Sequence, residues 1–130
     1  MSFKTKVLII FLVVIAFDAI ASLLSRLLQF DYTNFVWMSF VIYVAVGFWG
    51  AFRQGFVYGM LLGAIAGLTD STVGWFISRM IGPFIQPKMP PLNPIVIGIT
   101  IVFVTLLALA IGSVGAVLCK VTGQTRTADA

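Results

Sequence analysis

The sequence predicts an all-α integral membrane protein with four transmembrane helices, and two observations support this prediction. Of the 130 residues, 61% are hydrophobic and only 9% are charged, whereas a soluble domain has about 25% charged residues. Four long apolar stretches are present, and a bilayer core of roughly 30 Å takes about 20 residues of helix. These stretches are apolar on every side, unlike the short alternating segments of a membrane β-barrel.

The four stretches define the expected helices. They run over Val7–Leu28, Phe35–Phe52, Phe56–Ile81 and Pro94–Cys119. The connection at Arg53–Gly55 is very short, so two antiparallel hairpins are expected in one transmembrane domain over residues 1–121. Residues 122–130 form a polar C-terminal tail without periodicity, which is typical of a frayed end.

The first stretch resembles a secretory signal, because Lys4 and Lys6 precede an apolar run that ends near Ala19-Ile20-Ala21. The apolar character continues to Leu28, however, beyond the length of a signal sequence. We therefore expect the first helix to remain in the protein.

The distribution of basic residues predicts the orientation, because cytoplasmic loops carry an excess of Lys and Arg. With a cytoplasmic N-terminus, the inner residues are Lys4, Lys6, Arg53, Lys120 and Arg126, and the outer residues are Arg26, Arg79 and Lys88. Both termini are then cytoplasmic. The short inner turn and the run from Gly55 to Pro83 have the general look of small bacterial inner-membrane proteins, so we expect that location.

A glycine recurs at every fourth residue of the third stretch. The series is Gly55, Gly59, Gly63 and Gly67. Small residues at this spacing allow helix backbones to approach closely in lipid. The partner is either the last stretch of the same chain, with Ala108, Gly112 and Ala116, or the same helix of a second copy. The intramolecular contact is favoured because a short chain must first pack itself.

Asp18 and Asp70 lie near the middle of their stretches, at similar depth. A carboxylate at the bilayer centre costs at least roughly 2.5 kcal/mol, and three hypotheses explain the two acids. They are hydrogen-bonded structural groups, or a proton or cation site, or partners of a basic group on another subunit. Ser22 and Ser25 share one side of the helix with Asp18, and Tyr43 or Tyr58 could supply a hydroxyl to the acids.

The first and third stretches show a weak internal sequence similarity, which we call the internal echo. Asp18 is followed by Ser25-Arg26-Leu27-Leu28, and Asp70 is followed by Ser78-Arg79-Met80-Ile81. A parallel two-helix repeat explains the echo, as do chance and shared helix-end chemistry.

All five prolines lie between Gly82 and Pro94. Proline restricts both its own backbone and that of the preceding residue, which predicts a rigid connector. The alternative is a docking surface for a partner, formed by Pro83, Phe84, Pro87, Pro90 and Pro91.

The composition excludes several kinds of site. The chain has no histidine, no glutamate and one cysteine, so we expect no metal site and no cofactor. The glycines have helical spacing rather than the spacing of a phosphate-binding loop. Two membrane aspartates could serve a hydrolase, but the Gly67-Leu68-Thr69-Asp70 context and the small number of helices argue against an enzyme.

The sequence therefore favours a non-catalytic membrane subunit or assembly factor that acts through helix packing. Its expected partners are membrane lipid, other membrane subunits or a second copy. The net charge of +4 indicates attraction to anionic headgroups, and the few polar residues leave no surface for nucleic acid. The alternative is a homo-oligomeric proton-coupled transporter or channel for a small solute, in which Asp18 and Asp70 carry the ion.

Overall fold

The protein is all-helical, with four helical stretches that are long and apolar enough to span a membrane, which confirms the predicted fold class. This computed structural model describes residues 1–85 and 92–123. The elements, in chain order, are α1 (Phe3–Leu28), η1 (Tyr32–Phe35), α2 (Val36–Ala51), α3 (Phe56–Thr69), η2 (Asp70–Gly74), α4 (Trp75–Ile81) and α5 (Pro94–Val121).

Local chemistry explains where these helices begin and end. α1 begins at Phe3, four residues before the predicted start, because the Ser2 side chain accepts a hydrogen bond from the Thr5 backbone N–H. α5 begins at Pro94 as the sequence suggests, and the Asn93 side chain accepts from the Ile95 N–H. Only residues 122 and 123 of the predicted tail lie within the described part of the chain.

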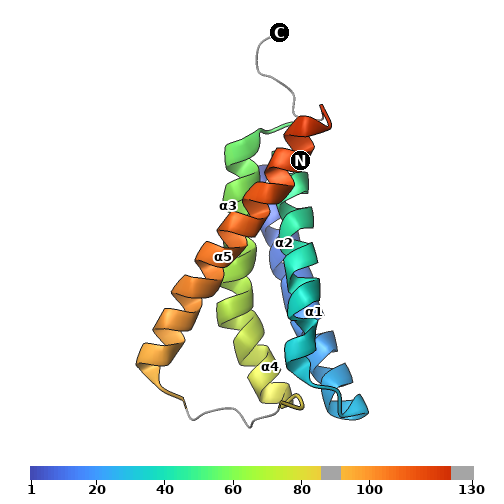
Figure 1. Cartoon of the computed structure of the whole chain (residues 1–130), viewed down its shortest axis with the longest axis vertical. Coiled ribbons are helices and arrows are strands. Elements are labelled where there is room, and N and C mark those ends of the chain that lie inside the picture. Colours follow the sequence, from blue (N-terminus) through green and yellow to red (C-terminus); the bar gives the residue numbers. More distant parts are fainter. Residues whose placement is uncertain (86–91, 124–130) are drawn as a thin grey trace.

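The helices form a bundle with two distinct ends (Figure 1). At the N-terminal end lie the start of α1, the turn between α2 and α3, and the end of α5. At the η1 end lie η1, the end of α4 and the start of α5. α1 runs parallel to α3 and α4, while α2 and α5 run in the opposite direction. α3 packs most extensively against α5 and α2, and α1 packs against α3 and α4.

The small residues of the third and fourth stretches meet each other. A Cβ added at Gly63 would lie 2.9 Å from the Cα of Gly112, and one added at Gly59 would lie 2.8 Å from the Ala116 Cβ. Gly67 faces Ala108 in the same way. These glycines therefore bring α3 and α5 together within one chain.

Gly55 does not share this role, contrary to the expectation from the spacing. Nothing lies within 4 Å of a Cβ added there, and its φ is +96°. Gly55 ends the turn between α2 and α3 in a backbone conformation that favours glycine. Of the four glycines in the series, Gly55 is therefore required by the turn, and the other three are required by the packing of α3 against α5.

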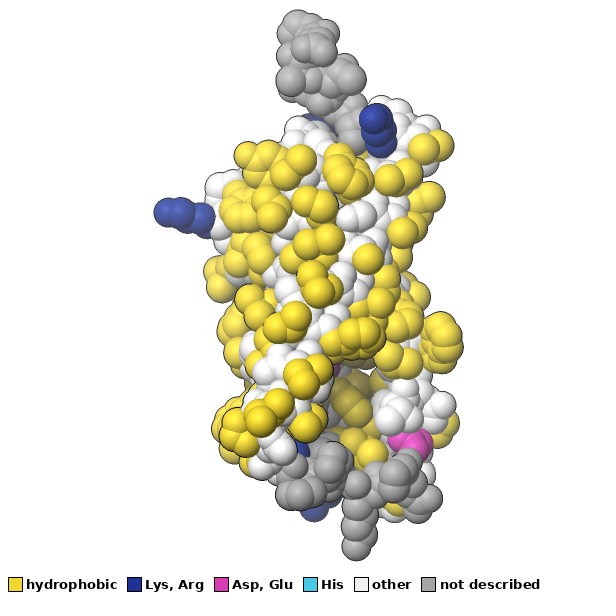
Figure 2. All heavy atoms as spheres, turned by 60° about the vertical axis from the view of Figure 1, so that its left-hand side comes forward, with side chains coloured by type: hydrophobic (Ala, Val, Ile, Leu, Met, Phe, Trp, Pro, Cys, Tyr) yellow, Lys and Arg dark blue, Asp and Glu magenta, His cyan; other side chains and the backbone are white. Residues whose placement is uncertain are grey.

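α5 packs against the bundle mainly along its second half, and Val104 and Thr105 of its first half also lie close to Gly67. Its buried residues are Ala108, Gly112, Gly115, Ala116 and Cys119. The first half of α5 leans away from the other helices toward the η1 end (Figure 1), and large side chains such as Ile99 and Phe103 are 65% and 63% exposed. Figure 2 shows hydrophobic side chains along this face, with Lys and Arg toward the ends, and a hollow near the η1 end.

We expect Gly63→Ala to lower the free energy of unfolding by about 1–3 kcal/mol, because the new methyl group would press on the α5 backbone. The matched control is Gly98→Ala, also on a helix, where a Cβ would meet nothing within 4 Å. That control should leave stability unchanged or raise it by up to about 1 kcal/mol. Unfolding in mixed micelles would measure both, and equal effects of the two changes would contradict the packing described here.

Candidate functional site

The two intramembrane acids meet inside the bundle. Asp18 lies on α1 and is 1% exposed, and Asp70 is the first residue of η2. The side chains of the two acids lie close together. Two ionised carboxylates at close range repel each other, so this arrangement favours a proton on one of the two carboxyl groups. We refer to Asp18 and Asp70 as the acid pair.

Tyrosine hydroxyls contact both members of the acid pair. The Tyr43 hydroxyl donates to Oδ2 of Asp70. The Tyr32 hydroxyl donates to Oδ1 of Asp18 over 3.3 Å and is 3.1 Å from the Ser78 hydroxyl. Hydrogen bonds thus connect Ser78 of α4, Tyr32 of η1 and Asp18 of α1. A separate bond connects Tyr43 of α2 to Asp70 of η2.

Oδ2 of Asp18 is buried and accepts no hydrogen bond from the donors of the described residues. A buried polar atom without a partner is costly. A proton shared within the acid pair would satisfy this oxygen. The geometry thus agrees with a pair that holds one proton between two carboxyl groups, as closely spaced carboxylates do elsewhere.

A widened helical turn makes room for the acid pair. η2 is a π-helix, in which the Trp75 N–H bonds to the Asp70 carbonyl oxygen. The Ser71 hydroxyl donates to the Gly67 carbonyl oxygen over 2.8 Å and supports the backbone of the preceding turn. Gly74 faces Asp18, and a Cβ at this position would overlap Oδ2 of Asp18. Single π turns within α-helices occur frequently at functional sites.

Contacts at the η1 end hold Tyr32 in place. The Ser25 hydroxyl donates to the Phe30 carbonyl oxygen over 2.6 Å and accepts from the Phe84 N–H over 3.1 Å. The Tyr32 N–H bonds to the Phe84 carbonyl oxygen over 2.9 Å, and Arg26 donates to the Ile81 carbonyl oxygen over 2.8 Å. These bonds join the end of α1 to the chain after α4.

The proline-rich segment is only partly within the described chain. Phe84 takes part in the contacts at the η1 end through its backbone, and Pro83 is half-buried beside it. Pro87, Pro90 and Pro91 lie outside the described residues. The docking hypothesis for this segment stays a prediction.

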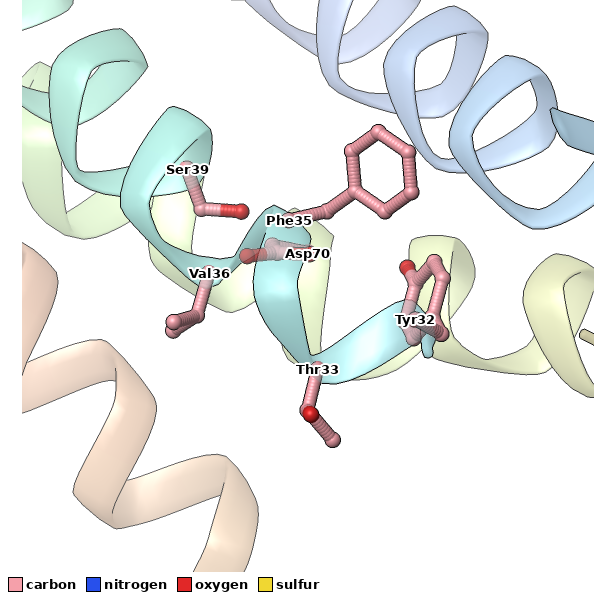
Figure 3. Close-up of a pocket in the computed structure, with 6 residues that line it drawn as sticks. All are labelled: Tyr32, Thr33, Phe35, Val36, Ser39 and Asp70. Atoms are coloured by element: carbon pink, nitrogen blue, oxygen red, sulfur yellow. The ribbon is translucent and has the colours of Figure 1, made fainter. Parts of the chain in front are cut away.

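A cavity of about 360 Å³ lies beside Asp70, and Figure 3 shows six residues that line it. Its lining consists of Tyr32, Thr33, Phe35, Val36, Ser39 and Asp70. Asp70 reaches the cavity, whereas Asp18 lies behind it and is not part of the lining. Toward the N-terminal end, buried apolar residues close off the acid pair, among them Ile10, Val14 and Leu62.

The structure brings together some of the predicted site residues and separates others. Asp18, Asp70 and the fully buried Ser22 lie at the site, while Ser25 acts at the η1 end. Tyr58 supplies no hydroxyl to the acids, since its ring packs against Phe3 at the N-terminal end, with centroids 5.8 Å apart. Two further contributors had no clear signal in the sequence, because Tyr32 resembles a membrane-interface aromatic residue and Gly74 lies outside the glycine series.

The chemistry available at the acid pair is the exchange of protons or cations. The residues within 1–85 and 92–123 contain no group of three or more His, Cys, Asp or Glu side chains that could hold a metal ion. Comparisons of the chain with models of protein families, with curated proteins and with solved structures find no match. The roles of these residues are therefore inferred from geometry and chemistry.

We expect Tyr43→Phe to lower the free energy of unfolding by about 1–3 kcal/mol, because Asp70 would lose a buried hydrogen-bond donor. Tyr58→Phe is the matched control, since its ring is 43% exposed and distant from the acids, and it should change stability by less than about 0.5 kcal/mol. Unfolding of both variants under the same micelle conditions gives the comparison. A Tyr43→Phe protein as stable as the control would contradict the hydrogen bond described here.

Proposed function

We propose that the protein is a proton-coupled membrane transporter or channel for a small solute, and that the acid pair carries the proton. The observation that supports this proposal is the contact between Asp18 and Asp70, which come from separate helical stretches. Ionisable groups inside membranes are costly and commonly belong to ion or proton pathways. Helix packing alone requires neither two acidic side chains at one place nor a buried carboxyl oxygen without a partner, such as Oδ2 of Asp18.

Access to the acid pair from one end supports the same proposal. The described lining of the cavity beside Asp70 comes mainly from η1 and the start of α2, and the apolar core that includes Ile10, Val14 and Leu62 lies toward the N-terminal end. A transporter exposes its binding site to one side of the membrane at a time. The structure would then correspond to one of two such states, and helix movement along the small residues of α3 and α5 would give the other.

We infer that the termini are cytoplasmic and that the membrane is a bacterial inner membrane. Among the described residues, Lys4, Lys6, Arg53 and Lys120 lie at the N-terminal end, and Arg26 and Arg79 at the η1 end. This excess of basic residues favours a cytoplasmic N-terminal end. The cavity beside Asp70 would then face the periplasmic side.

The proposal predicts that the acid pair releases its proton as the pH rises. Infrared spectra of the protein in lipid bilayers should contain a protonated-carboxyl band that decreases with increasing pH, and the frequency or pH dependence of this band should change in Asp18→Asn and in Asp70→Asn. Both variants should also lose proton flux into liposomes, measured with a pH-sensitive dye in the lumen. Asp31→Asn is the matched control, because an asparagine oxygen can still cap η1 as Asp31 does.

A band that persists unchanged over the whole stable pH range would contradict the proposal and would favour a structural hydrogen bond. Flux that continues in both acid variants would contradict it as well.

A second candidate function is that of a non-catalytic subunit or assembly factor of a membrane complex. The exposed first half of α5 favours it, because no residue from Pro94 to Leu107 is buried in the chain. Another subunit, a second copy or lipid would cover this surface in the membrane. The small residues of α3, by contrast, are already in contact with α5 and would not be free for a partner.

Extraction from the native membrane in a mild detergent separates the two candidates. The transporter proposal predicts a monomer or a homo-oligomer, whose mass and composition show this chain alone. The subunit hypothesis predicts a stoichiometric complex with other chains. Native mass spectrometry of the extracted protein would give both the mass and the composition.

A further inference from the structure

We propose that the cavity beside Asp70 binds a monovalent lipophilic organic cation, which exchanges for the proton of the acid pair. This inference rests on the proposed function, because it names the class of solute that the proton would be coupled to. Exchange of one proton for one such cation leaves the total charge of the site unchanged. The bilayer would then never have to accommodate an additional charge.

The lining of the cavity matches this class of ligand. Its described lining contains the aromatic residues Tyr32 and Phe35, the aliphatic side chain of Val36 and one acidic group, Asp70, and none of these described lining residues is basic. A cation near aromatic faces and a carboxylate is stabilised electrostatically. An anion would be repelled by Asp70 once the proton leaves, and a neutral solute would leave the carboxylate without a counter-charge.

The dimensions and surroundings of the cavity argue for an organic rather than an inorganic cation. Its volume of about 360 Å³ is near the lower end of the range for small-molecule sites, roughly 300–1,000 Å³. Besides Asp70, the side chains of the described lining residues offer the hydroxyls of Tyr32, Thr33 and Ser39, fewer oxygens than a divalent cation takes from protein and water. Val36, one of the apolar lining residues, is 44% exposed.

The two members of the acid pair can take different parts in the exchange of the proton for the cation. Asp70 lines the cavity and would contact the cation, while Asp18 lies behind it with Oδ2 unpartnered. The other titratable groups that face the pair are Tyr32 from η1 and Tyr43 from α2. From α4 the pair is approached by the Ser78 hydroxyl, and α5 has no charged residue between Pro94 and Cys119. The basic residue of α4, Arg79, lies over the Trp75 ring, with its guanidinium carbon 5.3 Å from the ring centroid.

The test uses benzyltrimethylammonium as the cation and benzylsulfonate as an anion of similar shape. Isothermal titration calorimetry is performed on the full chain in phospholipid nanodiscs, with empty nanodiscs subtracted. We expect saturable binding of the cation only. The heat should depend on the ionisation enthalpy of the buffer, because cation binding releases up to one proton from the acid pair.

Three variants locate the binding. Asp70→Asn should weaken cation binding by about tenfold or more, since a charge-assisted contact is lost. Val36→Trp should weaken it to a similar extent by filling the cavity, while the acid pair and its infrared band remain. Asp31→Asn should bind the cation as the unaltered protein does, because Asp31 does not line the cavity.

The outcomes distinguish this inference from the proposed function. The cation site is overturned if the cation does not bind, if the anion binds equally well, or if Asp70→Asn and Val36→Trp leave cation binding unchanged. In each of these cases the proposed function stands if the infrared band still titrates. Cation binding without proton release overturns the exchange. A band that does not titrate overturns the proposed function and the exchange together.

Discussion

A carboxyl group buried in a membrane must hold a proton or receive hydrogen bonds, and this requirement organises the η1 end of the bundle. Asp18 and Asp70 satisfy part of it by contacting each other, and Tyr32 and Tyr43 supply the hydroxyl donors. The space for the contact comes from the π turn of η2 and from the missing side chain of Gly74. The surrounding structure is therefore explained by the cost of leaving two acids unpaired.

The two ends of the bundle are held together by different interactions. Near the N-terminal end, glycine and alanine bring α2, α3 and α5 into backbone contact, as at Gly47 and Gly112. At the η1 end, hydrogen bonds join α1, η1 and α4, as between Ser25 and Phe84. α5 takes part only in the first kind of contact, and its first half therefore diverges and leaves the Asp70 cavity open beside α2.

The sequence predicts the helices well because length and apolar composition alone determine which segments can cross a bilayer. It also places Asp18 and Asp70 at similar depth. It does not predict that Tyr32 turns back into the bundle, because that depends on the bond between its N–H and Phe84, more than fifty residues along the chain. The π turn was missed for a similar reason, since the packing of Asp18 against Gly74 is a tertiary contact.

The first and third stretches, whose sequences are similar after Asp18 and Asp70, also contact each other near their ends. Ser25 of α1 bonds to Phe84, just after α4, and Ser78 of α4 bonds to Tyr32, just after α1. A repeat related by an approximate twofold axis stays a prediction, because the first contact reaches a backbone N–H and the second a side-chain hydroxyl. The symmetry is incomplete at the site, because only Asp70 lines the cavity. Two like groups in unlike surroundings can take different roles, which is the condition that an exchange of proton for solute requires.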